Sequence, residues 1–448
     1  MKYTVGIDLG STTTKAVVLD AGAGPDDGLR VLGRGITNSR SNYDVACAVA
    51  LADALVDARL SMVSTALERV GVDAERRREA LSGLTLRFRA EQYRRQLTEL
   101  DSTVRRLAVE AGDDLRVAER LAVDELLASL AADAGTLFTP EARRRSDFFR
   151  DLAGAQYMRK AEDLTREGGC GARSKGARFD SIVALYDKAI LTVENTETSA
   201  ADFEDCMHTA VLDPDSPVRE LAGAVEEAMS QPMEKLASVG TGYGRARLPF
   251  DDAQIRSEIL CHGLGAFAMF PGTRTVLDIG GQDTKAIQVD NRGIVTSFQM
   301  NDRCAAGCGR YLGYIADEMN LGLHELGPLA NEAKRPVRIN STCTVFAGAE
   351  LRERLSLGEK REDILAGLHR AIILRAMSLL ARSGGVKDEF TFTGGVANNA
   401  AAVTALRDLI LENYGEVKIN ISPKSIYTGA LGAAIFAGRS VEQEVPAA

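Results

Sequence analysis

Tryptophan is absent from the 448 residues, and aromatic residues make up only 5% of them. Such a composition does not favour a surface that stacks nucleic-acid bases. A basic excess is missing too, because 54 Lys and Arg face 63 Asp and Glu, for a net charge of −9. This acidic balance argues against nucleic acid as a partner.

Long apolar runs are also lacking. The run AIILRAMSLLA contains Arg375 and is shorter than the ~18 apolar residues that a membrane-spanning helix needs. The first residues, MKYTVGIDLGS, predict a β-strand where a signal peptide would place a charged segment and then a long apolar one. We therefore expect a cytoplasmic protein without a membrane partner.

Metal-ligand patterns are sparse. Of the four histidines, His208, His324 and His369 have no companions at the spacing of a metal site. The cysteines are odd in number and scattered, which disfavours a disulfide framework and leaves a metal site or buried thiols. The seven are Cys47, Cys170, Cys206, Cys261, Cys304, Cys308 and Cys343.

The length suggests two or three domains. Strand patterns occupy residues 1–41 and return after about residue 233, whereas residues 42–232 are rich in Ala, Leu, Arg and Glu at helical spacing. We therefore expect an α/β core interrupted by an α-helical insertion.

Within the insertion, residues 76–120 hold 11 Arg against 8 acidic residues. That run is either a solvated helix surface with i,i+4 ion pairs or a docking face for an acidic partner.

The segment GIDLGSTTTK, residues 6–15, lies between two strand patterns. Gly10 permits a tight turn, and the N–H groups and hydroxyls of the turn can surround phosphate oxygens. Asp8 can hold a hydrated Mg²⁺, and Lys15 supplies a counter-charge for phosphate. By itself the segment is equally well a hairpin with a polar turn. Its candidate binding residues are Gly10, Ser11, Thr12, Thr13, Thr14 and Lys15.

The same arrangement recurs in VLDIGGQDTK, residues 276–285. Two such hairpins across a cleft would clamp phosphates with one aspartate from each side. A third segment, FTGGVANN at residues 392–399, ends a strand and opens a helix, which suits close approach of the backbone to a purine and ribose. The three together predict a nucleotide site, although the Walker pattern GxxxxGK[ST] is absent. We assign Asp8, Asp278 and Gln282 as catalytic candidates, and Gly280, Gly281, Asp283, Gly394 and Gly395 as binding candidates.

The order of these three segments resembles the superfamily of actin, sugar kinases and seventy-kilodalton chaperones. The resemblance implies an α/β fold: an actin-like core of two ribonuclease-H-like subdomains around ATP, here with a large α-helical insertion. On this reading, residues 1–41 begin the first ATPase subdomain and residues 42–232 form the insertion. Residues 233–448 complete the core and carry the adenosine segment.

Two further turns contain cysteines, NDRCAAGCGR around Cys304 and NSTCTVFAGAE around Cys343. Each lies at the start of a predicted helix, where N–H groups can stabilise a thiolate or a cluster sulfide. Two thiolates are too few for a four-cysteine cluster, so a second chain would have to supply two more. Alternatively, both are buried structural cysteines.

These turns, together with VGTGYGR, SEILCHGLGA and the glycine segments, resemble one branch of the superfamily. It comprises the ATPases that activate 2-hydroxyacyl-CoA dehydratases and the ATPase subunits of ATP-dependent benzoyl-CoA reductase. The resemblance implies that Cys304 and Cys343 bind one [4Fe–4S] cluster shared across a subunit interface. The activators usually have a threonine-like residue where this chain has Cys308, which is therefore either a spare thiol, the interpretation we favour, or a swapped ligand. ATP and Mg²⁺ complete the expected cofactors. The insertion and the preceding GITNSRSNYD are similar to the larger ATPase component of benzoyl-CoA reductase.

We therefore expect an ATPase subunit that couples hydrolysis to electron transfer within a benzoyl-CoA reductase complex. Its expected partners are a smaller paralogous subunit in a pseudo-symmetric heterodimer, two aryl-CoA-binding Fe–S subunits, and reduced ferredoxin. The alternatives are a homodimeric activator of a 2-hydroxyacyl-CoA dehydratase, a non-redox actin- or chaperone-like ATPase, and a sugar or acetate kinase. Glu258, on a helix with His262, either positions the attacking water or has a packing role.

Overall fold

The computed structural model describes residues 1–22, 28–39, 42–142, 149–166, 176–196, 200–301, 308–339 and 344–444. The chain forms two compact units, one made of Met1–Leu55 with Met233–Ala448 and the other of Val56–Pro232. The first boundary falls inside helix α1 (Tyr43–Arg69), which continues without a break from one unit into the other.

The first unit contains two mixed sheets. The sheet nearer the N-terminus has four strands in the order β3-β2-β1-β4. β1 pairs antiparallel with β2 and parallel with β4, and β2 pairs antiparallel with β3. Nearly every residue of β1 is buried, as expected for an apolar strand covered on both faces. The strands are β1 (Lys2–Leu9), β2 (Thr13–Asp20), β3 (Val31–Asn38) and β4 (Glu234–Thr241).

The second sheet has five strands in the order β7-β6-β5-β8-β9 and repeats this pattern. β5 pairs antiparallel with β6 and parallel with β8, so each sheet places a hairpin beside a parallel strand. In this unit the predicted strand–turn–strand segments are therefore hairpins at equivalent places. The strands are β5 (Thr275–Ile279), β6 (Thr284–Val289), β7 (Val295–Asn301), β8 (Phe390–Thr393) and β9 (Ile419–Ile421).

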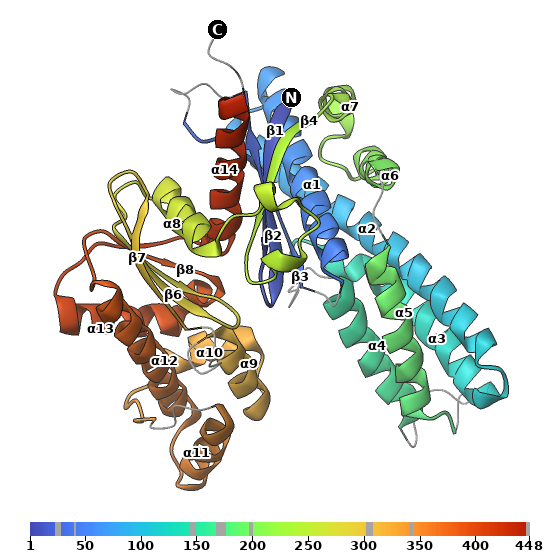
Figure 1. Ribbon diagram of the computed structural model, residues 1–448. Coiled ribbons are helices and arrows are strands. Elements are labelled where there is room, and N and C mark those ends of the chain that lie inside the picture. The colour runs from blue at the N-terminus through green and yellow to red at the C-terminus, as the bar shows by residue number, and fades with distance from the viewer. Residues whose placement is uncertain are drawn as a thin grey trace. The chain divides into compact units, whose positions relative to one another are not determined.

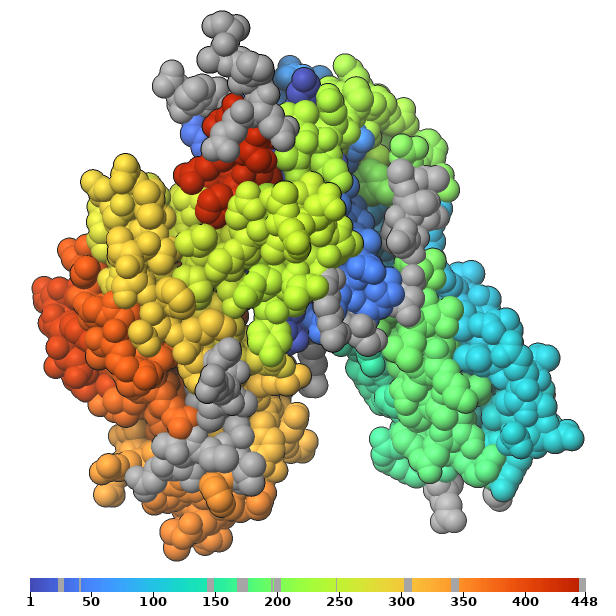
Figure 2. All heavy atoms as spheres, in the orientation of Figure 1, coloured from blue at the N-terminus to red at the C-terminus, as the bar shows by residue number. Residues whose placement is uncertain are grey.

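Helices cover both sheets. α14 (Thr428–Glu444) packs against α8 (Glu258–Met269) and against β1 (Figure 1). Figure 2 shows side chains of the segment between β4 and α8, in yellow-green, filling the surface beside α14, in red. The remaining helices of this unit are α9 (Gly309–Glu318), α10 (Leu323–Ala330), α11 (Thr344–Ser356), α12 (Arg361–Ser383) and α13 (Ala400–Tyr414).

Among the described residues, α12 alone is long and apolar enough to cross a membrane by length and composition. It contains the run noted above around Arg375. Most of its apolar stretch is buried against neighbouring helices, and Ile364, Leu368 and Ile372 belong to the largest core of the unit. α12 therefore has the burial of a core helix.

The described residues of the second unit form α-helices and short 3-10 helices, with no strand among them. α2 begins after Asp73, whose carboxylate accepts the N–H groups of Glu75 and Arg76. The recurring apolar residues of α2, including Leu97, Leu100 and Val104, face a core shared with α3, α4 and α5. The helices are α2 (Ala74–Glu110), α3 (Val117–Asp133), α4 (Phe149–Thr165), α5 (Phe179–Asn195), α6 (Ala200–Leu212) and α7 (Ala222–Ser230).

The arginines of α2 form ion pairs along the helix. Arg105 pairs with Asp101 and Arg106 with Glu110, each one turn away. These pairs fit the solvated-surface interpretation of residues 76–120. The docking interpretation stays a prediction.

Candidate functional site

Each hairpin of the first unit presents one buried aspartate beside one lysine. Asp8 ends β1 directly opposite Lys15 of β2, and the Lys15 Nζ lies 3.3 Å from the Asp8 Oδ2. Asp278 of β5 likewise lies directly opposite Lys285 of β6, and the Lys285 Nζ is 3.4 Å from the Asp278 Oδ2. Both carboxylates are more than nine-tenths buried. The duplicated sequence pattern thus becomes a duplicated ion pair.

The second aspartate has the denser polar surroundings. The Thr393 hydroxyl donates to Asp278 Oδ1 across 2.8 Å, and His262 Nδ1 lies 3.2 Å from the same oxygen. Burial by itself would raise the pKa of Asp278, but His262 and Lys285 outweigh it and hold the pKa well below its usual range. Asp278 is therefore ionised, so it can bind a cation but is a weak proton acceptor.

Lys285 is shared among three carboxylates. Its Nζ lies 2.7 Å from Asp283, 3.4 Å from Asp278 and 3.8 Å from Glu258. Burial by itself would lower the pKa of Lys285, yet these neighbours raise it above its usual range. Asp283, a predicted phosphate-binding residue, therefore forms an ion pair with Lys285 and neutralises its charge.

The turns of the two hairpins touch. A Cβ atom at Gly281 would lie 2.0 Å from Thr12 Oγ1 and 3.5 Å from Ser11 Oγ. Only glycine permits this approach, which brings the hydroxyls of the first turn to the backbone of the second. The structure thus brings together the predicted residues Ser11, Thr12, Gly280 and Gly281.

Gln282 points to the start of α9. In the amide orientation that satisfies both groups, its side-chain oxygen accepts from Arg310, with Nη2 at 3.1 Å. The backbone N–H groups of Gly309 and Arg310 donate to the carbonyl oxygens of Gly280 and Gly281, each across 2.8 Å. The second turn is therefore hydrogen-bonded to α9, and Gln282 makes a side-chain contact there.

The third glycine segment, residues 392–399, lies beside the end of β5, which also carries Asp278. Gly394 has a φ of +85°, and a Cβ atom there would lie 2.3 Å from the Ile279 carbonyl oxygen. The backbone after β8 can therefore pass directly beside the end of β5. Asn399 then accepts the N–H groups of Ala401 and Ala402 to begin α13. Gly394 and Gly395 thus lie at the sheet edge that also carries Asp278, and their role in nucleotide binding stays a prediction.

Two residues near the first hairpin, Ser39 and Gly242, were not predicted as site residues from the sequence. Ser39, which follows β3, donates its hydroxyl to the Gly10 carbonyl oxygen and lies 3.0 Å from Thr14 Oγ1. A Cβ atom at Gly242, after β4, would lie 2.5 Å from Asp8 Oδ1. In the sequence, both segments stand out only through the family resemblance. Their strands flank the hairpin, so their roles depend on sheet order.

The donor set fits Mg²⁺ bound together with nucleotide phosphates. Mg²⁺ usually takes one or two carboxylates and keeps several waters, with substrate phosphates as further ligands. Asp8 and Asp278 supply two buried carboxylates, and the Thr393 hydroxyl donates to the second of them. No group of three or more His, Cys, Asp or Glu arranged for a metal occurs in the part of the chain that the structure describes. A site of two aspartates therefore needs the phosphates to complete it.

The predicted cluster ligands, Cys304 and Cys343, lie outside the described residues. Cys308 is described, is buried and stands at the residue before α9. In the sequence Cys304 is five residues before Gly309, which begins the helix whose first N–H groups bond to Gly280 and Gly281. Iron binding by the two cysteines stays a prediction.

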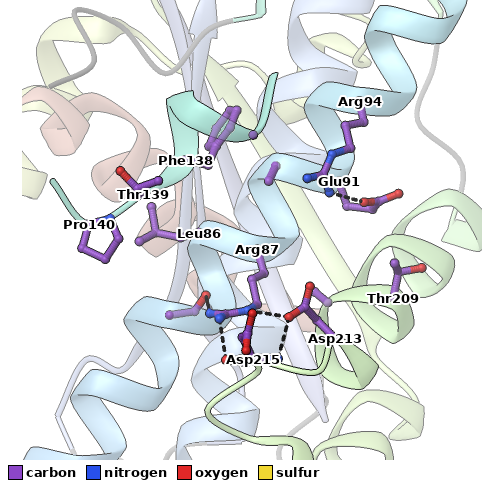
Figure 3. Close-up of a pocket in the computed structure, with 14 residues that line it drawn as sticks. Leu86, Arg87, Glu91, Arg94, Phe138, Thr139, Pro140, Thr209, Asp213 and Asp215 are labelled. Atoms are coloured by element: carbon purple, nitrogen blue, oxygen red, sulfur yellow. Dashed lines mark hydrogen bonds and ion pairs between the residues drawn. The ribbon is translucent and has the colours of Figure 1, made fainter. Parts of the chain in front are cut away.

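A separate cavity of about 320 Å³ lies within the second unit, lined by residues of α2 and α6 and by the segment after α3 (Figure 3). Its Arg87 side chain turns to Asp213, and its Arg94 pairs with Glu91. Because these cations are already neutralised within the cavity, they do not select an anionic ligand. We assign no function to this cavity.

Comparison with known proteins agrees with this geometry. The family described as the BadF/BadG/BcrA/BcrD ATPase family matches residues 5–437. The chain is 42% identical over 221 residues to the (R)-2-hydroxyglutaryl-CoA dehydratase activating ATPase of Acidaminococcus fermentans, covering 49% of this chain and 82% of the relative. It is 40% identical over 228 residues to the activator of lactoyl-CoA dehydratase of Anaerotignum propionicum, covering 51% and 85%.

A more distant relative is a benzoyl-CoA reductase subunit of Thauera aromatica, which is 32% identical over 214 residues, or 48% of this chain and 75% of the relative. Among solved structures, that of the Acidaminococcus fermentans (R)-2-hydroxyglutaryl-CoA dehydratase component A superposes with a TM-score of 0.53 at 23% identity, covering 99% of this chain and all of that one. The predicted α/β, actin-like fold class is confirmed. The chain belongs to the BadF/BadG/BcrA/BcrD ATPase family.

Proposed function

We propose that this protein is an ATP-driven electron-transfer activator of an enzyme that acts on a CoA thioester, with a 2-hydroxyacyl-CoA dehydratase as the first candidate. The observation that carries the proposal is the pair of hydrogen bonds from Gly309 and Arg310 to Gly280 and Gly281. They join the turn that we propose binds phosphate to α9, which begins five residues after Cys304. A change at the nucleotide is thereby transmitted to the backbone beside the predicted cluster.

The choice of partner revises the expectation from the sequence. Three dehydratase activators are 40–43% identical to this chain, whereas the benzoyl-CoA reductase relative of Thauera aromatica is 32% identical. The similarity therefore favours the activator alternative over the reductase component.

The reductase remains the second candidate because of the helical unit Val56–Pro232. The activator matches cover about half of this chain but 72–85% of the relatives, so those relatives are much shorter. The sequence of the helical insertion is similar to the larger ATPase component of the reductase. In the reductase, that component pairs with a smaller paralogue. A heterodimer and ferredoxin as electron donor belong to this candidate.

The proposed hydrolysis assigns a role to the described residues of both hairpins. Lys15 and Lys285 place positive charge at the base of each turn, and the backbone N–H groups of the turns would bind the phosphates. Asp8 and Asp278 would hold Mg²⁺, which would supply charge stabilisation for the phosphates, and the two carboxylates would help to orient the attacking water. Loss of the terminal phosphate would remove an anion that both turns contact, and so would change how the two turns are held.

Cys304 and Cys343 would hold the [4Fe–4S] cluster, whose chemistry is the uptake and release of one electron. With only two thiolates per chain, the other two ligands would come from a second protomer. A change in the angle of α9 would alter the Cys304 side of that interface. The nucleotide state would in this way set the surroundings of the cluster.

The proposal is tested by anaerobic purification of the protein with the proteins that accompany it. We expect iron at four atoms per dimer, in line with one [4Fe–4S] cluster, and ATP hydrolysis by the purified protein. Reduced by a low-potential donor, the protein should support 2-hydroxyacyl-CoA dehydration by a purified dehydratase. Support of benzoyl-CoA reduction instead, with a co-purifying smaller paralogue, would select the second candidate. An iron-free dimer that hydrolyses ATP would overturn both.

The assignment of Cys304 and Cys343 as cluster ligands can be tested by substitution, with the neighbouring Cys308 as the control. Cys304→Ala and Cys343→Ala should each abolish the electron paramagnetic resonance signal of the reduced cluster while MgATP still binds. Cys308→Ala, which changes a buried thiol only four residues from Cys304, should keep the signal. A signal that survives Cys304→Ala contradicts the assignment.

A further inference from the structure

Helix α8 carries two buried polar side chains one turn apart, Glu258 and His262. The exposed fractions of these residues are 5% and 7%. Burying an ionisable group is costly unless the surroundings compensate for it. The partners of these two side chains therefore indicate what the helix contributes.

His262 lies between the aspartates of the two hairpins. On one edge of the ring, Nδ1 is 3.2 Å from Asp278 Oδ1, although the contact is not aligned for a hydrogen bond. On the other edge, a Cβ atom at Gly429 would lie 2.8 Å from His262 Nε2 and 3.0 Å from Asp8 Oδ2. The imidazole and the Asp8 carboxylate thus border the same small space at the first turn of α14.

The packing of α8 holds the ring in this place. A Cβ atom at Gly432 of α14 would lie 1.9 Å from the Cys261 carbonyl oxygen, so the two helix backbones are in direct contact beside His262. A shift of α8 would therefore move α14 as well, and α14 packs on β1, the strand of Asp8. The helix cannot move His262 without disturbing both aspartates.

Glu258 occupies a different place. Its carboxylate is 3.8 Å from both Lys285 Nζ and Arg245 Nη1, beyond hydrogen-bond distance. Burial raises the pKa of Glu258, against the effect of Lys285. It balances the lysine of the second hairpin but contacts neither aspartate. Of the two α8 side chains, only His262 links Asp8 and Asp278.

We propose that His262 is a positioning residue of the ATPase site, which fixes the orientation of the Asp278 carboxylate and its separation from Asp8. The inference rests on the proposed ATP hydrolysis and deepens it. Two carboxylates that share one hydrated cation must be correctly spaced before the cation binds, because misplacement of a reacting group by about 1 Å can cost about 100-fold in rate. Removal of the ring would let Asp278 rotate toward Lys285, its nearest cation.

The test compares His262→Ala and His262→Gln with the wild-type protein in ATP hydrolysis at varied ATP and Mg²⁺. We expect His262→Ala to lower kcat by about 10- to 100-fold, to change the KM for ATP by no more than about threefold, and to raise the Mg²⁺ concentration that gives half-maximal rate. His262→Gln keeps a polar group beside Asp278 and should recover at least part of kcat. If His262→Ala does not fold, His262→Gln carries the comparison through its Mg²⁺ dependence, and a half-maximal Mg²⁺ concentration equal to that of the wild-type protein would overturn the role.

His369→Gln is the matched control. His369 is equally buried, on α12, and its Nδ1 hydrogen-bonds to the Leu365 carbonyl oxygen across 2.7 Å, away from both aspartates. Its replacement should leave kcat and the Mg²⁺ dependence unchanged. An unchanged kcat in both His262 variants, a loss confined to KM, or an equal loss of kcat in His369→Gln would overturn the positioning role. A wild-type protein that does not hydrolyse ATP would instead overturn the proposed function itself.

Discussion

Gly309 donates its backbone N–H to the carbonyl oxygen of Gly280 across 2.8 Å. The first residue of α9 is thereby bonded to the turn that is expected to hold phosphate, and Arg310 repeats the contact at Gly281. The first N–H groups of a helix lack partners within the helix, so α9 depends on this turn for two of them. Movement of the turn must therefore move the helix or break these bonds.

Replacing Arg310 by Ala tests whether Gln282 must be held in place. The exposed guanidinium is the donor to the Gln282 amide oxygen, so its loss frees that side chain without opening the core. We expect kcat for ATP hydrolysis to fall by about 10-fold while the unfolding transition is unchanged. Arg352→Ala, which removes another exposed arginine, paired with Glu318, is the control and should leave kcat unchanged. Equal rates for both variants would exclude a role for the Gln282 contact.

Lys285→Met should destabilise the first unit strongly. The substitution leaves Asp278, Asp283 and Glu258 buried without their shared cation, and an unpaired buried charge costs about 3–5 kcal/mol. Lys15→Met removes a lysine that pairs with one carboxylate, that of Asp8, and should cost less. Urea unfolding followed by circular dichroism measures both. A smaller loss for Lys285→Met than for Lys15→Met would contradict the ranking.

Glu119 gives the helical unit a pH-dependent contribution. This buried carboxylate accepts Arg178 Nε at 2.6 Å and the Arg116 N–H at 2.8 Å. The hydrogen bond to Arg178 is the main reason that its pKa is lowered to about 2. Because the folded-state pKa is below the unfolded value of about 4.3, the stabilisation is complete above that value and is lost as the pH falls toward 2.

Glu119→Gln should therefore lower the free energy of unfolding at neutral pH by about 1–3 kcal/mol, toward the lower end because Arg178 is half exposed. Urea unfolding between pH 2 and 7 provides the measurement. The wild-type and variant curves should converge as the pH approaches 2. Curves that stay parallel would show that the carboxylate is not the titrating group.

Comparing the Tm of Gly394→Ala with that of Gly395→Ala distinguishes the effect of backbone strain from the effect of adding a methyl group. Gly394 has a positive φ, and a Cβ atom there would collide with the Ile279 carbonyl oxygen at 2.3 Å. A residue forced into such a conformation costs about 1–3 kcal/mol before the collision is counted. At Gly395 a Cβ atom would meet only Ile426 Cδ1, at 4.0 Å. Thermal unfolding should show a lower Tm for Gly394→Ala alone; similar values for the two variants would contradict this account.

The hairpins were predictable because their signals are local. Asp8 and Lys15 are separated by one tight turn, as are Asp278 and Lys285, so antiparallel pairing brings each pair together once the strands are recognised. The third glycine segment was predictable for the same reason, since Gly394 marks a backbone conformation that other residues avoid.

His262 and Ser39 show why the rest of the site was not predictable. His262 meets Asp278 only because α8 packs between the second sheet and α14, and nothing in the sequence around it specifies that neighbour. Ser39 reaches Gly10 because β3 pairs with β2 beyond the first hairpin. A short polar residue after a strand is otherwise common, so the sequence carries no signal for this contact.

Local sequence signals are enough to specify the two Asp–Lys hairpins, the glycine segment that follows them and the helical character of the residues around 74–110. These features depend on turn residues and on periodicity, which act over a few neighbouring positions. The packing of distant segments, in contrast, adds Glu258 to the carboxylates around Lys285, places one imidazole between two aspartates and bonds α9 to the turn of the second hairpin. Such contacts join residues far apart in the chain, and they exist because buried polar groups must find partners when the helices and sheets pack together.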